Sequence, residues 1–311
     1  MKLFVFGDSY ADTGNLPSSV SKSWKQPYGI TFPGKPSGRF SDGRVLTDYI
    51  ASFVGIRSPW PYQLKNFNTK TTRYGINFAH GGTGVFKTLV DQPNMTTQID
   101  FFQQLINNNV YTIQNLSSSF ALVSLAGNDY SAYLANNGRF EDLPGFTRSV
   151  INQLMLNLKR IKGFGIKKIG ITGIEPLGCL PINTASAAYA NCNAAQNNFS
   201  QFHNQLLKQS IGALNNESAA PVFIYLDLYT AFLSALKTKQ NPPGNLSNKL
   251  RPCCIGLKGE DCGLVDKNGN KKYEVCENPK HSFFWDSIHP SNAGWRAIYS
   301  SLKRSLHPFL P

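Results

Sequence analysis

The chain has 311 residues, of which 31 are Lys or Arg and 18 are Asp or Glu, so its net charge is +13. Hydrophobic residues make up 41%, enough for a substantial core, but no apolar run reaches the roughly 20 residues that span a bilayer. No Lys/Arg run exceeds two or three residues and no nucleic-acid-binding module is recognisable, so we expect no nucleic-acid partner. The charge favours a basic solvated surface, with attraction to acidic cell-wall polymers as the alternative.

Strands and helices are predicted to alternate along the chain. Apolar, β-branched or aromatic runs predict five strands, at 3–6, 73–78, 120–125, 168–172 and 222–226. Apolar residues at helical spacing predict helices at 44–54, 146–161, 197–214 and 293–306. This alternation predicts an α/β fold in which a parallel sheet is covered on both faces. We expect a single domain over residues 1–311.

Two short motifs at opposite ends of the chain supply the parts of an acyl-transfer triad. Ser9 follows the first predicted strand, where a helix is expected to begin, and Asp286 precedes His289 by three residues. A serine hydroxyl becomes a good nucleophile when a base takes its proton, and the base needs a carboxylate to hold its tautomer. We therefore predict Ser9 as nucleophile, His289 as general base and Asp286 as orienting acid. The alternatives are a helix-capping role for Ser9 and for Asp286.

Other histidines and acids compete for these roles. The competing histidines are His80, His203, His281 and His307. His289 is preferred because it alone has an acid at i−3 and a following proline that restricts the backbone. Asp8 and Asp12 lie too close to Ser9 in sequence to orient a base that arrives from the other side. We expect them to hold the turn through hydrogen bonds to the backbone.

The oxyanion formed during acyl transfer needs preorganised donors. Ser9 follows the first predicted strand, Gly81 and Gly82 follow the second, and Asn128 follows the third. The carboxyl ends of parallel strands meet at one edge of a sheet, which is where ligands bind. We predict an oxyanion hole made of the Ser9 backbone N–H, the Gly82 backbone N–H and the Asn128 side-chain amide. Gly81 is the fallback donor.

Four sequence blocks together resemble a known family. Residues 7–15 read GDSYADTGN, residues 77–84 NFAHGGTG, residues 125–130 LAGNDY, and residues 286–290 DSIHP. In this order, over essentially the whole chain, they resemble the plant branch of the GDSL esterase/lipase family within the SGNH hydrolases. The resemblance implies a flavodoxin-like three-layer αβα sandwich with a five-stranded parallel sheet. Ala126 stands where the family usually has glycine. This difference bears on the shape of the loop, whereas the expected donor Asn128 is present.

The cysteines indicate an oxidising compartment. They are even in number and none has metal-ligand spacing with histidine: Cys179, Cys192, Cys253, Cys254, Cys262 and Cys276. Sequence order suggests a Cys179–Cys192 loop and two bridges within 253–276, and the resemblance implies the same grouping; six free thiols are the alternative. Residues from about 241 to 282 would then form a stapled insertion beside the cleft. We expect no metal and no cofactor, since neither His-x-x-x-His nor a carboxylate cluster appears.

The resemblance also implies an activity and a location. It points to a secreted, monomeric serine esterase or lipase of the apoplast or another secretory compartment, acting on a small-molecule or lipid ester. One alternative is an acyltransferase of plant specialised metabolism that passes the acyl group to a hydroxylated acceptor. Another is a non-catalytic binding protein, which would have lost a triad or oxyanion residue.

Two further features bear on secretion. Proteins that resemble this chain usually carry a secretory leader before the first strand, so we expect that this chain is the trimmed form with Met1 added. Five sequons permit glycosylation, although this asparagine-rich chain would contain about as many by chance: Asn94, Asn115, Asn198, Asn216 and Asn245.

Overall fold

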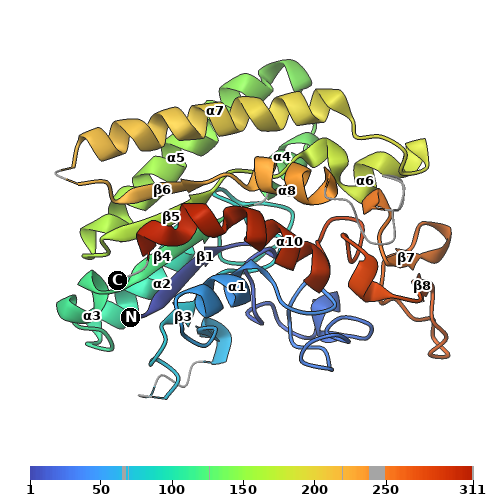
Figure 1. Ribbon diagram of the computed structural model, residues 1–311, viewed down its shortest axis with the longest axis horizontal. Coiled ribbons are helices and arrows are strands. Elements are labelled where there is room, and N and C mark those ends of the chain that lie inside the picture. The colour runs from blue at the N-terminus through green and yellow to red at the C-terminus, as the bar shows by residue number, and fades with distance from the viewer. Residues whose placement is uncertain (65–67, 69, 126, 219, 238–248, 310–311) are drawn as a thin grey trace.

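The computed structural model describes residues 1–64, 68, 70–125, 127–218, 220–237 and 249–309 (Figure 1). The predictions that concern Ala126, the Asn245 sequon and residues 241–248 of the expected insertion lie outside the described residues.

A parallel sheet forms the centre of the molecule. Its strands are β1 (Leu3–Gly7), β2 (Trp60–Pro61), β3 (Ile76–Asn77), β4 (Phe120–Ser124), β5 (Lys168–Thr172) and β6 (Phe223–Leu226), in the spatial order β2-β3-β1-β4-β5-β6. Val5 in β1 pairs with Asn77 in β3 and with Leu122 in β4. Without β2 the order is that of flavodoxin-like folds, whose switch point lies between β1 and β4.

The five predicted strands are present, but the sheet has a sixth strand that was not predicted. β2 is the pair Trp60–Pro61 at the edge of the sheet. Two residues are too few to show a period, and proline cannot donate to a ladder, which restricts it to edges. The predicted strand 73–78 is also shorter than expected, since only Ile76–Asn77 pairs with its neighbours.

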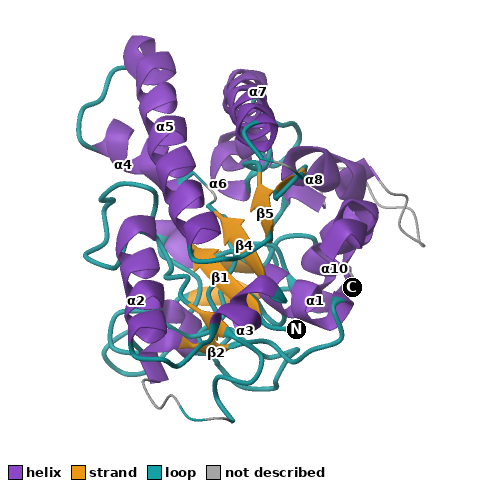
Figure 2. Ribbon diagram, turned by 90° about the vertical axis from the view of Figure 1, so that its left-hand side faces the viewer, coloured by secondary structure: helices purple, strands orange, loops and turns teal. Residues whose placement is uncertain are grey.

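Helices cover both faces of the sheet (Figure 2). They are α1 (Leu46–Phe53), α2 (Met95–Asn107), α3 (Ile113–Ser117), α4 (Asn128–Ala135), α5 (Leu143–Gly163), α6 (Pro181–Thr184), α7 (Ala194–Asn216), α8 (Leu228–Lys237) and α10 (Asn292–Leu302). Short 3₁₀ helices occupy 22–24, 62–64, 140–142, 177–179, 185–187, 257–259, 279–281 and 303–309. Five of these helices were not predicted from the sequence, namely α2, α3, α4, α6 and α8, although Met95, Ile99 and Phe102 have helical spacing in α2.

Alternate residues of β1 point into two hydrophobic cores. Phe4 and Phe6 pack with the buried faces of α2, α5 and α7, whereas Leu3 and Val5 pack with those of α1, α8 and α10. Every residue of β1 and β4 is buried, as is typical of parallel strands covered on both faces. This burial fixes the sheet register and therefore the positions of the loops at its carboxyl edge.

Three disulfides join the six cysteines in the expected grouping. Cys179 pairs with Cys192, Cys253 with Cys276, and Cys254 with Cys262. The last two staple the antiparallel pair β7 (Cys254–Gly256) and β8 (Tyr273–Val275), which encloses a small core of its own with Tyr28 and Trp285.

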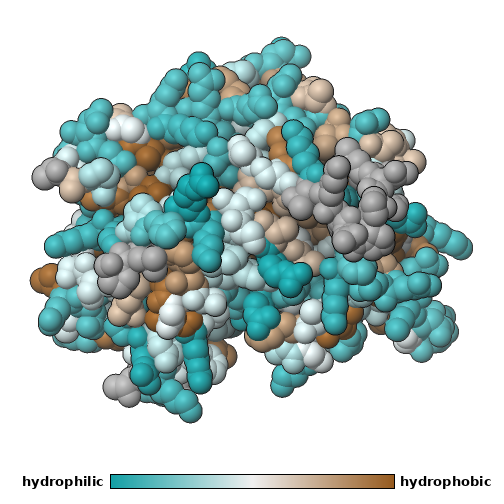
Figure 3. Space-filling model, in the orientation of Figure 1, coloured by the Kyte–Doolittle hydropathy of each residue, from teal (hydrophilic) through white to brown (hydrophobic). Residues whose placement is uncertain are grey.

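No helix among the described residues is long and apolar enough to cross a membrane. The face drawn in Figure 3 is largely hydrophilic, with hydrophobic residues in small separate patches.

Candidate active site

Ser9 lies in a tight turn at the carboxyl end of β1. Gly7, with φ 153°, closes the strand, and a Cβ there would lie 2.0 Å from the Ser124 carbonyl oxygen, so only glycine fits. The predicted helix after Ser9 is wrong: the chain makes one turn, in which Ala11 and Asp12 donate their N–H groups to the Asp8 carbonyl.

The Asp12 carboxylate gives a physical reason for this early stop. It accepts the backbone N–H groups of Gly14 at 2.8 Å and Asn15 at 2.7 Å, offering the backbone an alternative to helical bonding. Asp8 accepts the Tyr10 N–H at 3.0 Å in the same way. Both acids thus hold the turn through backbone hydrogen bonds, as the sequence analysis expected.

The turn at 286–289 holds an acid and an imidazole side by side. The Asp286 Oδ1 atom accepts the backbone N–H groups of Ile288 at 2.9 Å and His289 at 2.8 Å. Trp285 donates its backbone N–H to the His289 carbonyl at 2.7 Å, which closes the turn. Local backbone bonding therefore sets the position of His289 relative to Asp286.

Ser9, His289 and Asp286 form one hydrogen-bonded line. His289 Nδ1 lies 2.8 Å and 2.9 Å from the two Asp286 carboxylate oxygens. With its Nδ1 proton donated to the carboxylate, His289 has Nε2 left as an acceptor, and Nε2 lies 2.8 Å from Ser9 Oγ. The exposed fractions are 7% for Ser9, 6% for His289 and 1% for Asp286. The arrangement allows the imidazole to take the hydroxyl proton of Ser9.

Tyr28 is a further partner of Asp286 that the sequence analysis missed. Its hydroxyl donates to Asp286 Oδ2 at 2.7 Å. Burial alone would raise the pKa of Asp286, but the His289 imidazole, Lys22 and the Tyr28 hydrogen bond outweigh it and hold that pKa well below its usual range. Burial and the Asp286 charge raise the pKa of Tyr28 well above 10, so the phenol keeps its proton and remains a donor.

Two aromatic rings pack against the His289 imidazole. The Phe40 ring lies 5.0 Å from it, centroid to centroid, and the Tyr10 ring lies 5.9 Å from it edge-on. Phe40 belongs to the loop that precedes α1. The Tyr10 hydroxyl also reaches the Ile288 carbonyl at 3.0 Å and Glu175 Oε1 at 3.2 Å. These contacts restrict the motion of the imidazole.

The two glycines after β3 differ in their hydrogen bonds. Gly81 donates its N–H to Asp12 Oδ2 at 3.0 Å. In the part of the chain that the structure describes, the backbone N–H groups of Gly82 and Ser9 have no acceptor within hydrogen-bond distance. Gly82 has φ 78°, a conformation that favours glycine. The geometry therefore favours Gly82 over Gly81 as a donor.

Asn128 begins α4 directly beyond β4. Its side-chain amide donates to Asp8 Oδ2 at 3.1 Å and to the Thr83 carbonyl at 3.0 Å. These bonds tie the ends of β1, β3 and β4 together at the switch point of the sheet. Asn128 thus lies at the carboxyl edge of the sheet, as predicted, and both hydrogens of its amide already form hydrogen bonds.

The competing histidines make contacts elsewhere. His203 Nδ1 lies 2.6 Å from the Tyr130 hydroxyl in the core, and burial lowers its pKa to about 3. His80 Nδ1 lies 2.8 Å from the Phe78 carbonyl, and the His307 ring packs 6.1 Å from that of Phe53. Among the described side chains, no group of three or more His, Cys, Asp or Glu residues could hold a metal ion.

A flavodoxin-like αβα sandwich that holds serine, histidine and aspartate in line at its carboxyl edge has the architecture of an SGNH hydrolase. Residues 3–302 match the family model described as GDSL-like Lipase/Acylhydrolase, so the chain belongs to the GDSL esterase/lipase family of carboxylic ester hydrolases.

Individual relatives support this assignment. A GDSL esterase/lipase of Arabidopsis thaliana is 53% identical over 98% of this chain and 86% of its own length, and a second is 51% identical over 98% and 88%. Acetylajmalan esterase 2 of Rauvolfia serpentina is 30% identical over 96% of this chain and 88% of its own. Among solved structures, the acetylxylan esterase Axe2 of Geobacillus stearothermophilus aligns with 100% of this chain and 96% of its own at 14% identity, with a TM-score of 0.44.

Proposed function

We propose that this protein is a serine esterase that cleaves carboxylic esters through an acyl-enzyme on Ser9. His289 Nε2 takes the hydroxyl proton while Ser9 Oγ forms a bond to the ester carbonyl carbon. His289 then gives that proton to the alkoxide as the carbon–oxygen bond breaks, and the alcohol leaves. In the second half, His289 takes a proton from water, the resulting hydroxide attacks the acyl carbon, and the acid is released as Ser9 regains its proton.

The negative charge on the carbonyl oxygen is stabilised by donors at three strand ends. The backbone N–H groups of Ser9 and Gly82 have no acceptor among the described residues, and we assign the Asn128 amide as the third donor. To bind the oxyanion, the Asn128 amide gives up its hydrogen bond to either the Asp8 carboxylate or the Thr83 carbonyl and donates to the negatively charged oxygen instead. The observation that carries the proposal is the 2.8 Å approach of Ser9 Oγ to an imidazole that Asp286 already orients.

Product analysis by mass spectrometry tests this function. The purified protein and its Ser9→Ala variant are given a panel of acyl esters, with and without hydroxylated acceptors. We expect free acid with the intact serine alone. Transfer to an acceptor that outpaces acid release would instead make the protein an acyltransferase, because the two reactions share every step before deacylation. Equal turnover by Ser9→Ala would contradict the assigned nucleophile.

We also propose that the chain works as one domain and as a monomer in the secretory pathway. The triad closes between the two ends of one chain, and three disulfides suit an oxidising compartment. Asn198 and Asn216 are exposed on α7, so both are open to glycosylation, whereas Asn94 is half-buried and caps α2 by accepting the Thr97 N–H. Peptide mapping after expression in plant cells would show which sequons carry glycans.

A further inference from the structure

A cavity of about 350 Å³ adjoins the candidate active site. Asn128, the assigned oxyanion donor, and Ile288, the neighbour of His289, both line it. The rest of the wall comes from α4, from residues 140–143, from residues 177–183 after β5 and from the first turns of α7. A group attached to a carbonyl carbon beside Asn128 can therefore continue directly into this space.

The lining of the cavity is apolar and carries no formal charge in the part of the chain that the structure describes. Its main contributors are leucine, isoleucine and phenylalanine side chains: Leu134, Leu143, Leu177, Leu180, Phe199 and Ile288. Its neutral polar members are Asn128, Tyr130, Ser131, Asn183 and Gln196. Such a site gains affinity from burying apolar surface and has no partner for a charged ligand.

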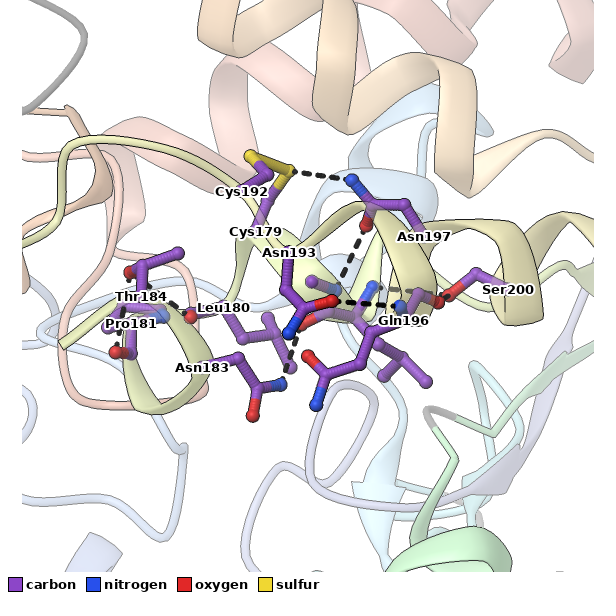
Figure 4. Close-up of a disulfide and its surroundings, with 12 residues drawn as sticks. Cys179, Leu180, Pro181, Asn183, Thr184, Cys192, Asn193, Gln196, Asn197 and Ser200 are labelled. Carbon is purple, nitrogen blue, oxygen red and sulfur yellow. Dashed lines mark hydrogen bonds between the residues drawn. A yellow bond between two sulfur atoms is a disulfide. The ribbon is translucent and has the colours of Figure 1, made fainter. Parts of the chain in front are cut away.

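One wall of the cavity is rigidly built. The Cys179–Cys192 disulfide joins the segment after β5 to the start of α7, and Asn197 donates to Cys179 Sγ at 3.4 Å while accepting the Gly178 N–H at 2.9 Å (Figure 4). Asn183 donates to the Leu177 carbonyl at 2.8 Å. In Figure 4, Asn183 and Gln196 lie below this disulfide. The wall is thus held in place before any ligand binds.

We propose that this cavity binds the acyl group of the ester substrate and selects a neutral, medium-length alkyl chain. The proposal rests on the proposed esterase function and specifies its substrate class. The cavity holds the volume of about twelve water molecules at about 30 Å³ each, and a methylene is of similar size, so a chain of about six to ten carbons fits within it without filling it completely. The acyl part suits a walled cavity, because it stays on Ser9 throughout the covalent intermediate while the alcohol must leave.

Chain-length profiles test the acyl assignment. p-Nitrophenyl acetate, butyrate, octanoate and palmitate share a leaving group, and we expect kcat/KM to be greatest for octanoate by tenfold or more over acetate. A second series compares ethyl octanoate with octyl acetate, in which the alkyl chain lies on the alcohol side. A preference for octyl acetate, or a flat acyl profile, would overturn the proposal.

Filling the cavity gives the sharper test. Ser131 and Leu134 lie one turn apart on α4 and both line the cavity, and Ser131 is exposed, so Ser131→Trp adds volume without opening the core. We expect this variant to lose tenfold or more in kcat/KM for octanoate and less than twofold for acetate. Leu156→Trp, at an exposed leucine of α5, is the control and should leave both values unchanged. Equal loss for both esters in a folded Ser131→Trp protein would contradict the proposal; Leu134→Trp provides a second variant.

Equilibrium binding separates this inference from the catalytic one. Octanamide, a neutral amide of the same chain length, is titrated calorimetrically into Ser9→Ala and into the double variant Ser9→Ala/Ser131→Trp. Binding by the first and a tenfold or greater loss in the second would support the cavity even if no ester were cleaved. Ester cleavage together with equal binding by both variants would leave the esterase intact and refute the acyl site.

Discussion

The two halves of the candidate site are prepared to different degrees. In the proton-transfer half, Ser9, His289 and Asp286 already form the hydrogen bonds that the proposed reaction uses. In the proposed oxyanion half, the Ser9 and Gly82 N–H groups have no acceptor within the described part of the chain, but the Asn128 amide donates to Asp8 and Thr83. In the proposed reaction, the first half is therefore complete before substrate arrives, whereas the second must exchange a hydrogen bond of Asn128 when the oxyanion forms.

The exchange at Asn128 has an energetic consequence. Replacing one hydrogen bond by another changes the free energy little in the ground state, since net hydrogen-bond contributions are about 1 kcal/mol. A developing oxyanion is a stronger acceptor than the Thr83 carbonyl, so the gain comes mainly in the transition state. Substitutions in the two halves should therefore lower kcat by different factors and differ in their effect on KM.

The largest expected effect comes from breaking the proton-transfer half. Asp286→Asn removes the charge that holds the His289 tautomer, and we expect kcat for ester hydrolysis to fall by about 10⁴-fold. Tyr28→Phe removes only one neutral donor to the same carboxylate, so its kcat should fall by about tenfold or less. Steady-state kinetics on both variants check this order. An Asp286→Asn enzyme that keeps a tenth of its activity would refute the assigned acid.

An intermediate effect is expected in the oxyanion half. Asn128→Ala should lower kcat by about 10² to 10³-fold while KM changes little, because the lost bond forms in the transition state. Asn136→Ala, at the other end of α4, is the matched control and should retain full activity. A rise in KM with unchanged kcat would show that Asn128 serves ground-state binding instead.

The smallest effect concerns Glu175, which contacts the site through Tyr10. Glu175 is fully buried, and its Oε2 has no hydrogen-bond partner among the described residues. Burial raises its pKa to about 8, with a smaller contribution from the Asp8 charge. The folded protein therefore holds this proton more tightly than the unfolded chain, so stability is full below about pH 4.5 and declines as the pH rises toward 8.

Glu175→Gln tests this pH dependence without changing the size of the side chain. We expect wild type to lose on the order of a few kcal/mol of unfolding free energy relative to the variant between pH 5 and pH 8, measured by urea denaturation. Glu217→Gln is the control, because Glu217 is an exposed glutamate at the C-terminal cap of α7. Parallel curves for wild type and Glu175→Gln would show that Glu175 is ionised in the folded protein.

The sequence carried more information about the proton-transfer half than about its surroundings. Asp286 and His289 are three residues apart, so a local turn brings them together, and the apolar runs placed Ser9 at a strand end. Strong runs such as 168–172 predicted strands well, because burial on both faces demands continuous apolar residues. The helix expected after Ser9 failed because the Asp12 carboxylate captures the N–H groups that a helix would use.

The sequence indicated the residues proposed to carry the chemistry, the alternation of strands and helices, and the grouping of the cysteines. All of these depend on short-range patterns. Tertiary structure alone decided that Tyr28 reaches Asp286 across 258 positions, that Phe40 packs on His289, and that Gly81 rather than Gly82 is bonded to Asp12. These contacts depend on how the loops at one sheet edge pack, and no local pattern in the chain encodes that packing.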